Sequence, residues 1–131
     1  MARANYAESR EQQLLISLID SYYPEWLIFH TPNGGRRAYK EAVIFKRMGV
    51  RAGVADLFLV EPTLEYHGLF LEMKKPGSKD DLSDDQKIFR DEVLRRGFHY
   101  AVADNGLEGL IICEEFLGIE NPISARMNLI G

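Results

Sequence analysis

Two charged side chains interrupt an apolar segment of the chain, GLFLEMKKPG at residues 68–77. Side chains alternate across a β-strand, so Glu72 and Lys74 would share one face, about 7 Å apart along the strand. A second apolar segment, GVADLFLV at residues 53–60, carries one acid, Asp56. If the two segments pair as a hairpin, Asp56 can lie beside Glu72. Two adjacent carboxylates repel, which raises the pKa of one of them unless a cation is present.

A hard divalent cation would relieve this repulsion. Mg²⁺ takes one or two carboxylates, keeps several waters and uses phosphate oxygens of a substrate as further ligands. A neighbouring lysine can position or help to deprotonate the attacking water, or stabilise charge that develops on the phosphate. Asp56, Glu72, Lys74 and a metal would therefore hydrolyse phosphodiesters. The alternative is that Glu72 and Lys74 lie hydrated at an open strand end, where KKPG already forms a surface turn.

The elements around these residues are predicted from apolar spacing and from turn and cap residues. Their order is αβαββαβα, with helices over 7–20, 36–49, 83–97 and 106–118 and strands over 25–30, 54–60, 68–73 and 98–103. Strands interspersed with amphipathic helices indicate an α/β domain, in which one central mixed sheet is flanked by helices.

The helix over 83–97 has the clearest boundaries. Ser83 is the expected N-cap and Gln86 stands at the capping-box position three residues later, while Gly97 is the expected terminator. Gln86 is thus a candidate for a purely structural role.

Composition limits the class of protein. The chain has 131 residues, 46% of them hydrophobic, and is expected to form one domain over 1–131. Its apolar runs are shorter than the roughly 20 residues that cross a bilayer, and it has no apolar N-terminal leader, so a soluble, cytoplasmic protein is expected. The one cysteine, Cys113, excludes an internal disulfide and is expected to be a buried apolar residue.

The charge of the chain is unevenly distributed. The net charge is −4, yet six basic residues and one acid fall between residues 36 and 51, a local charge of +5. A basic surface for nucleic acid is therefore available. The three histidines lack zinc-ligand spacing, although His30 could line a cleft. No phosphate-binding nucleotide motif occurs, so no nucleotide cofactor is expected.

Four segments together resemble the virus-type replication-repair nuclease (VRR-NUC) domain of the PD-(D/E)XK nuclease superfamily. They are NGG at 33–35, MGVRAGVADLFLV at 48–60, LEMKKPGSKDDLSDDQKIF at 71–89 and RRGFHYAVADNGLEGL at 95–110. The similarity extends over about residues 7–117 and implies a restriction-endonuclease-like fold. One residue departs from the pattern: Ala55 stands where the family has proline, a residue that shapes the backbone and binds no metal.

The resemblance implies a role for each residue of the motif. Asp56 and Glu72 would bind the metal together with the backbone carbonyl of Met73, and Lys74 would act on the water or the scissile phosphate. Gln86 lies close to the active centre in the family, so a catalytic role stands beside its capping role.

An acid of the first helix completes the metal shell in related resolvases. Glu11 matches that acid by its place ahead of the apolar residues of the helix, and Glu8 is the alternative. Either glutamate could instead be an ordinary solvated side chain.

Six residues are expected to contact the DNA backbone: Asn33, Arg36, Arg37, Lys40, Arg47 and Lys75. The segment NGGRR offers backbone N–H groups and guanidinium groups near a helix start, which could bind a phosphate. The alternative is that it is an ordinary loop that leads into a helix.

The resulting hypothesis is a Mg²⁺- or Mn²⁺-dependent DNA endonuclease. The resemblance implies a homodimer that acts on branched DNA such as four-way junctions, in a phage or bacterial repair or recombination setting. One alternative is a less selective nuclease that trims flaps or ends. Another is a catalytically silent module of the same fold that binds DNA or a protein partner.

Overall fold

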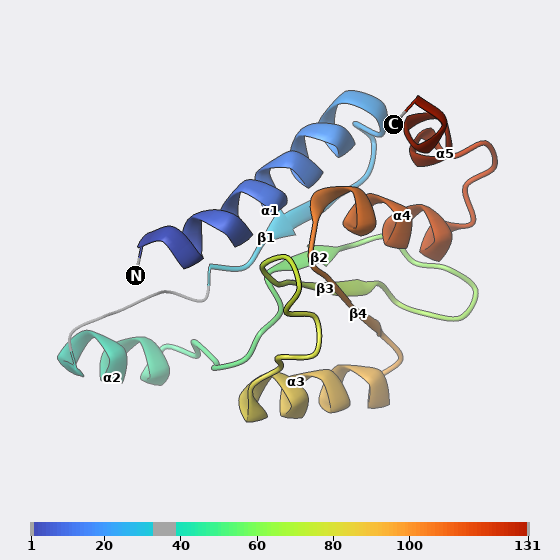
Figure 1. Cartoon of the computed structure of the whole chain (residues 1–131). Helices are drawn as coiled ribbons and strands as arrows, with labels where there is room; N and C mark the ends of the chain where they lie inside the picture. Colours follow the sequence, from blue (N-terminus) through green and yellow to red (C-terminus); the bar gives the residue numbers. More distant parts are fainter. Residues whose placement is uncertain (1, 33–38, 131) are drawn as a thin grey trace.

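The computed structural model describes residues 2–32 and 39–130 (Figure 1). These residues form five helices and four strands in the order α1 (Ala2–Tyr22), β1 (Ile28–His30), α2 (Tyr39–Arg47), β2 (Leu57–Leu59), β3 (Leu69–Met73), α3 (Asp84–Arg95), β4 (His99–Ala103), α4 (Gly106–Leu117) and α5 (Ile123–Ile130). The predicted order is confirmed up to α4. None of the helices described is long and apolar enough to cross a membrane.

The four strands form one mixed sheet in the order β1-β2-β3-β4. The pairs β1/β2 and β2/β3 are antiparallel, and β4 runs parallel to β3 after the crossover through α3. Leu57 pairs with Leu71, which confirms the predicted hairpin and places Asp56 next to Glu72. Both β1 and β4 are edge strands.

Helices cover both faces of the sheet, so β3 and β4 contribute to two apolar layers (Figure 1). On one face α1 and α4 pack on the sheet, with Leu15, Leu71 and Leu110 completely or almost completely buried. On the other face Phe89 and Val93 of α3 pack beside Phe70 and Tyr100. Because successive residues of β3 point to opposite faces, Glu72 faces the α3 side while its neighbours Leu71 and Met73 enter the larger core.

The ends of α3 follow the predicted signals. The Ser83 hydroxyl accepts the N–H of Gln86 at 3.1 Å, and the Gln86 side chain accepts the N–H of Ser83 at 2.8 Å, so the capping box is confirmed. Gly97 follows the helix at a φ of +88°, a conformation that favours glycine.

Helix α5 was not predicted. Its short segment lacks a clear apolar period, and it is held by a buried tertiary contact instead. Glu114 of α4 is 2% exposed and accepts hydrogen bonds from the hydroxyls of Tyr23, at 2.5 Å, and Ser124. The expected burial of Cys113 is confirmed, and burial raises the pKa of its thiol to about 12.

Candidate active site

The two carboxylates of the hairpin meet at one end of the β2/β3 pair. Asp56 directly precedes β2, and its Oδ2 accepts the backbone N–H of Met73 at 2.8 Å. Glu72 lies beside it, because the register that pairs Leu57 with Leu71 continues by one residue. The hydrogen bond from a peptide of β3 fixes the Asp56 side chain without using its second oxygen.

Glu72 is buried rather than hydrated, with 4% of its surface exposed. One carboxyl oxygen, Oε1, has no hydrogen-bond partner among the described residues. Burial, the charge of Asp56 and a hydrogen bond with Asp56 raise the pKa of Glu72 to about 9, and the nearby Lys74 opposes this rise. The alternative of a solvated strand end is therefore wrong for Glu72, since its carboxyl group is desolvated beside a second acid.

Gln86 connects the lysine to the buried acid. Its Nε2 donates to Glu72 Oε2 at 3.1 Å, and its Oε1 accepts from Lys74 Nζ at 2.9 Å. The same Oε1 accepts the backbone N–H of Ser83 in the capping box. The two roles considered for Gln86 are thus compatible, because the cap holds its amide at the start of α3, where it reaches both charged groups.

Contacts from the end of β1 and from the residue after it hold the backbone at Asp56. The Asp56 carbonyl accepts the N–H of Thr31 at 2.8 Å and the ring Nδ1–H of His30 at 2.8 Å. The Thr31 hydroxyl also donates to the carbonyl of Ala55. Sequence reasoning did not identify Thr31, since a single threonine before a proline gives no signal of a contact 24 residues away.

The glycine-rich segment before β2 packs against the start of α3. Gly53 has a φ of +82°, and a Cβ added there would lie 2.3 Å from the backbone oxygen of Asp85. Only glycine allows this approach. The contact brings the segment that leads to Asp56 against the helix that carries Gln86.

The two candidate acids of α1 have different surroundings. The Glu11 carboxylate accepts the N–H of Gly106 at 2.8 Å, so it is engaged at the start of α4. Glu8 instead lies by the carboxylate pair. Burial and the charge of Asp56 raise the pKa of Glu8, while Lys74 and Lys75 lower it. Of the two acids, Glu8 is the one whose charge acts on Asp56 and Glu72, and which acid would reach a metal ion there stays a prediction.

The carboxylates of Asp56 and Glu72 fit a hard divalent cation that takes its remaining ligands from water and substrate. No three His, Cys, Asp or Glu side chains within residues 2–32 and 39–130 converge as a complete metal cage. Mg²⁺ needs only one or two carboxylates in addition to water and phosphate oxygens, which the pair Asp56 and Glu72 supplies. The unpartnered Oε1 of Glu72 is the observation that supports this fit, because a buried carboxylate oxygen is normally bonded. The role of the Met73 carbonyl stays a prediction.

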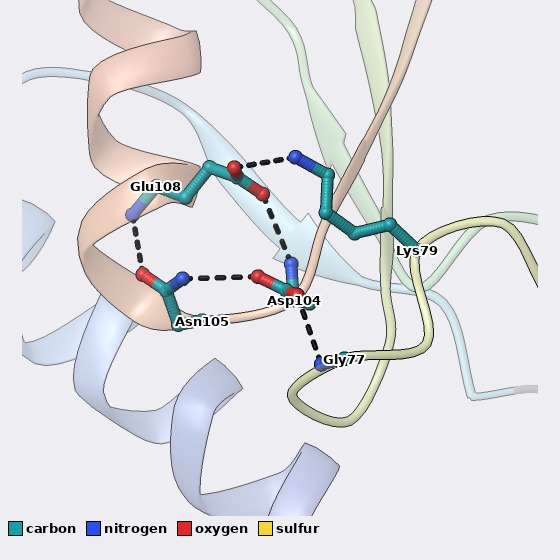
Figure 2. A network of polar contacts seen from close by, with 5 residues as sticks. All are labelled: Gly77, Lys79, Asp104, Asn105 and Glu108. Carbon is teal, nitrogen blue, oxygen red and sulfur yellow. Dashed lines mark hydrogen bonds and ion pairs between the residues drawn. The ribbon is translucent and has the colours of Figure 1, made fainter.

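A network of polar contacts holds the loop that follows β3 (Figure 2). The Gly77 N–H donates to Asp104 at 3.0 Å, and Lys79 Nζ pairs with Glu108 at 2.6 Å. Asn105 caps α4 through the N–H of Glu108 and also donates to Asp104. These contacts fasten the loop between Lys74 and α3 to the start of α4, and residue spacing alone did not predict them.

The residues expected to contact DNA divide into two groups. Three of them lie outside the described residues: Asn33, Arg36 and Arg37. Of the others, Lys40 and Arg47 are exposed on α2, which stands apart from the sheet (Figure 1). Lys75 is exposed in the segment that follows β3, and it lowers the pKa of Glu8.

Comparisons with known proteins agree with this arrangement. A family model described as the VRR-NUC domain matches residues 6–105. A solved structure described as a VRR_NUC domain protein is similar at 25% sequence identity and a TM-score of 0.70, covering 86% of this chain and 88% of that one. No curated protein sequence matches the chain.

Proposed function

Because the chain belongs to the VRR-NUC domain family, a family of nucleases, we propose that it is a Mg²⁺- or Mn²⁺-dependent DNA endonuclease with its active site at Asp56 and Glu72. The observation that carries the proposal is the buried Glu72 carboxyl group beside Asp56, whose Oε1 has no partner among the described residues. Such a pair destabilises a protein unless a ligand uses it.

In this proposal Asp56 and Glu72 hold the metal, with Glu8 reaching the same ion. When bound, the metal would supply Lewis-acid activation of a water and neutralise charge on the scissile phosphate. The chain positions its own groups for this reaction. Gln86 holds Glu72 and Lys74 in fixed relation, at 3.1 Å and 2.9 Å, so the Lys74 ammonium can donate to the attacking water or to a phosphate oxygen.

The substrate class proposed is branched DNA such as a four-way junction, cut by a homodimer. Two identical active sites related by a two-fold axis suit a substrate with paired, symmetric strands. The basic residues Lys40 and Arg47 of α2 and Lys75 beside the site would contact the DNA backbone.

Cleavage of a labelled panel tests the proposal. The panel contains a four-way junction, a flap, a linear duplex and a single strand, each with Mg²⁺, Mn²⁺ or EDTA. We expect metal-dependent cutting that Asp56→Asn and Glu72→Gln each reduce by at least about 10³-fold, as loss of a metal ligand should. Glu115→Gln, an exposed acid of α4, is the matched control and should retain activity. Cutting that survives both substitutions would refute the assignment of Asp56 and Glu72 to the active site. If no substrate is cut under any condition, the proposal that the protein is a nuclease is wrong.

The two acids of α1 can be separated in the same assay. Glu8→Ala should impair cleavage and weaken Mn²⁺ binding, whereas Glu11→Ala should mainly lower the melting temperature because it removes the acceptor for the Gly106 N–H. The reverse pattern would assign the metal to Glu11.

A further inference from the structure

A hollow of about 370 Å³ lies along the outer edge of β4, between α3 and the loop that precedes it. Among the described residues, its charged and polar lining comes from Lys79, Lys87, Arg90 and Tyr100, together with the acid Asp80. We propose that this hollow is a second phosphate site, which binds a backbone phosphate of the nucleic-acid substrate beside the cleavage centre. The inference rests on the proposed function and extends it.

The cations of the hollow are arranged to meet an anion. Lys87 and Arg90 are three residues apart on α3 and therefore share a face of that helix. Arg90 bonds Asp91 through its Nε at 3.0 Å. That bond leaves the two terminal guanidinium nitrogens for a bidentate contact with phosphate. The ammonium group of Lys79 forms an ion pair with Glu108, as Figure 2 shows. Lys87 and Arg90 would therefore provide most of the attraction for a phosphate.

A buried hydroxyl supports the presence of a ligand. Tyr100 is 8% exposed, and its hydroxyl has no hydrogen-bond partner among the described residues. A buried polar group normally has a partner, so a hydroxyl without one in the lining of a basic hollow indicates a group that the protein itself does not provide. The hydroxyl oxygen is itself enclosed, so a phosphate oxygen would accept the phenolic hydrogen once the side chains around it open towards the hollow.

The hollow is correctly placed for the strand that is cut. Glu72 pairs with Val102, and Phe70 pairs with Tyr100, so Tyr100 and Val102 lie on the α3 face of the sheet, one strand away from Glu72. Neighbouring strands are separated by about 4.8 Å. On α3, Gln86 contacts Glu72 and the next residue, Lys87, lines the hollow. A DNA backbone with one phosphate at the carboxylates would therefore pass this hollow with another.

The salt dependence of DNA binding tests the inference. Binding of a fluorescent four-way junction and of a linear duplex is measured by anisotropy from 50 to 300 mM salt, with the full chain carrying Glu72→Gln so that the DNA stays uncut. Lys87→Gln and Arg90→Gln should each weaken binding about 3- to 10-fold and lower the slope of log K against log salt by about one. Tyr100→Phe should weaken binding about threefold without changing the slope, since it removes no charge. Arg95→Gln, on the same helix outside the hollow, is the matched control and should change affinity less than about twofold.

A duplex with a single neutral methylphosphonate linkage, moved stepwise past the cleavage site, then locates the phosphate. At one position the linkage should weaken binding to the parent chain, and Arg90→Gln should cause no further loss there. If Lys87→Gln and Arg90→Gln are folded by circular dichroism and leave the slope of log K against log salt unchanged, the hollow is not a phosphate site. The proposed nuclease function would be unaffected by that result. If neither the parent chain nor the wild type binds or cuts any DNA, both the proposed nuclease function and the phosphate site in the hollow are wrong.

Discussion

At the scale of single residues, the chain keeps a group that weakens its own fold. The Glu72 carboxyl is buried beside Asp56, and among the described residues the neutral group that donates to it is the Gln86 amide. Burial of a carboxyl group near another acid stabilises its protonated form. We therefore interpret Glu72 as a residue retained for ion binding at the expense of stability.

The first prediction concerns stability against pH. The folded-state pKa of Glu72, about 9, lies above its ordinary value of 4.5, so the folded state holds the proton more tightly than the unfolded state. This contribution to the free energy of unfolding is fully present below pH 4.5 and is lost as the pH rises towards 9. In EDTA, Glu72→Gln should therefore be more stable than wild type by about 1–3 kcal/mol at pH 8, and close to it at pH 4.5.

Urea unfolding at the two pH values measures this difference. If Mg²⁺ binds the ionised pair as proposed, adding Mg²⁺ at pH 8 should stabilise the wild type and leave Glu72→Gln nearly unchanged. If Glu72→Gln were less stable than wild type by the same amount at both pH values, the interpretation that the ionised Glu72 carboxyl group lowers stability would be wrong.

The second prediction separates the two roles of Gln86. Ser83→Ala removes only the cap and should lower stability by about 1 kcal/mol, with cleavage nearly unchanged. Gln86→Ala removes the cap and also the contacts to Glu72 and Lys74, so its kcat should fall about 10- to 100-fold at a similar loss of stability. Chemical denaturation and single-turnover cleavage of both variants give the comparison. Equal activities would limit Gln86 to the capping box.

At the scale of elements, the site depends on close approach between segments that are distant in sequence. The turn before β2 packs on the start of α3, β1 holds the backbone of Asp56, and the loop after β3 is fastened to α4 (Figure 2). Each element carries one part of the site, and the packing between them sets the relative positions of the carboxylates, the lysine and the amide.

The third prediction tests one of these contacts with a matched pair of glycines. Gly53 and Gly77 have similar φ values, +82° and +85°, but only at Gly53 would a Cβ clash with the backbone, 2.3 Å from the Asp85 oxygen. Gly77→Ala should cost about 1 kcal/mol from backbone strain alone. Gly53→Ala should cost about 2–4 kcal/mol and also reduce cleavage, because the turn that leads to Asp56 must move away from α3.

Thermal unfolding and metal titration of the two variants make this comparison. If Gly53→Ala matched Gly77→Ala in both stability and Mn²⁺ affinity, the packing of the turn on α3 would not be what positions Asp56.

At the scale of the whole molecule, a chain of net charge −4 presents its positive groups in separate places. Lys40 and Arg47 lie on α2, which stands apart from the sheet, while Lys87 and Arg90 lie on α3 beside the site (Figure 1). A substrate that contacts both regions must be long enough to span them, which is consistent with the branched DNA proposed.

The fourth prediction concerns assembly. A homodimer would have twice the chain mass of 15.0 kDa, and light scattering coupled to size-exclusion chromatography measures that mass directly. If two sites act on one junction, mixing wild-type chains with an excess of Asp56→Asn chains should convert paired cuts into single nicks. A 15.0 kDa species that still makes paired cuts in the presence of excess Asp56→Asn chains would contradict the proposed dimer.

The sequence by itself determined the local features of this protein. Alternation along 68–73, the acid at 56 and the Ser83 to Gln86 spacing predicted the hairpin, the carboxylate pair and the capping box, because each depends on neighbours within a strand or a helical turn. The tertiary structure decided the rest. Apolar spacing defines only a broad face of α1, so it could not separate Glu8 from Glu11, whose partner Gly106 lies 95 residues away. The contacts of Thr31 with Asp56, of Gln86 with Glu72, and of the cations with the hollow beside β4 likewise exist only once separate elements pack together, since residue spacing along a chain carries no record of which distant surfaces meet.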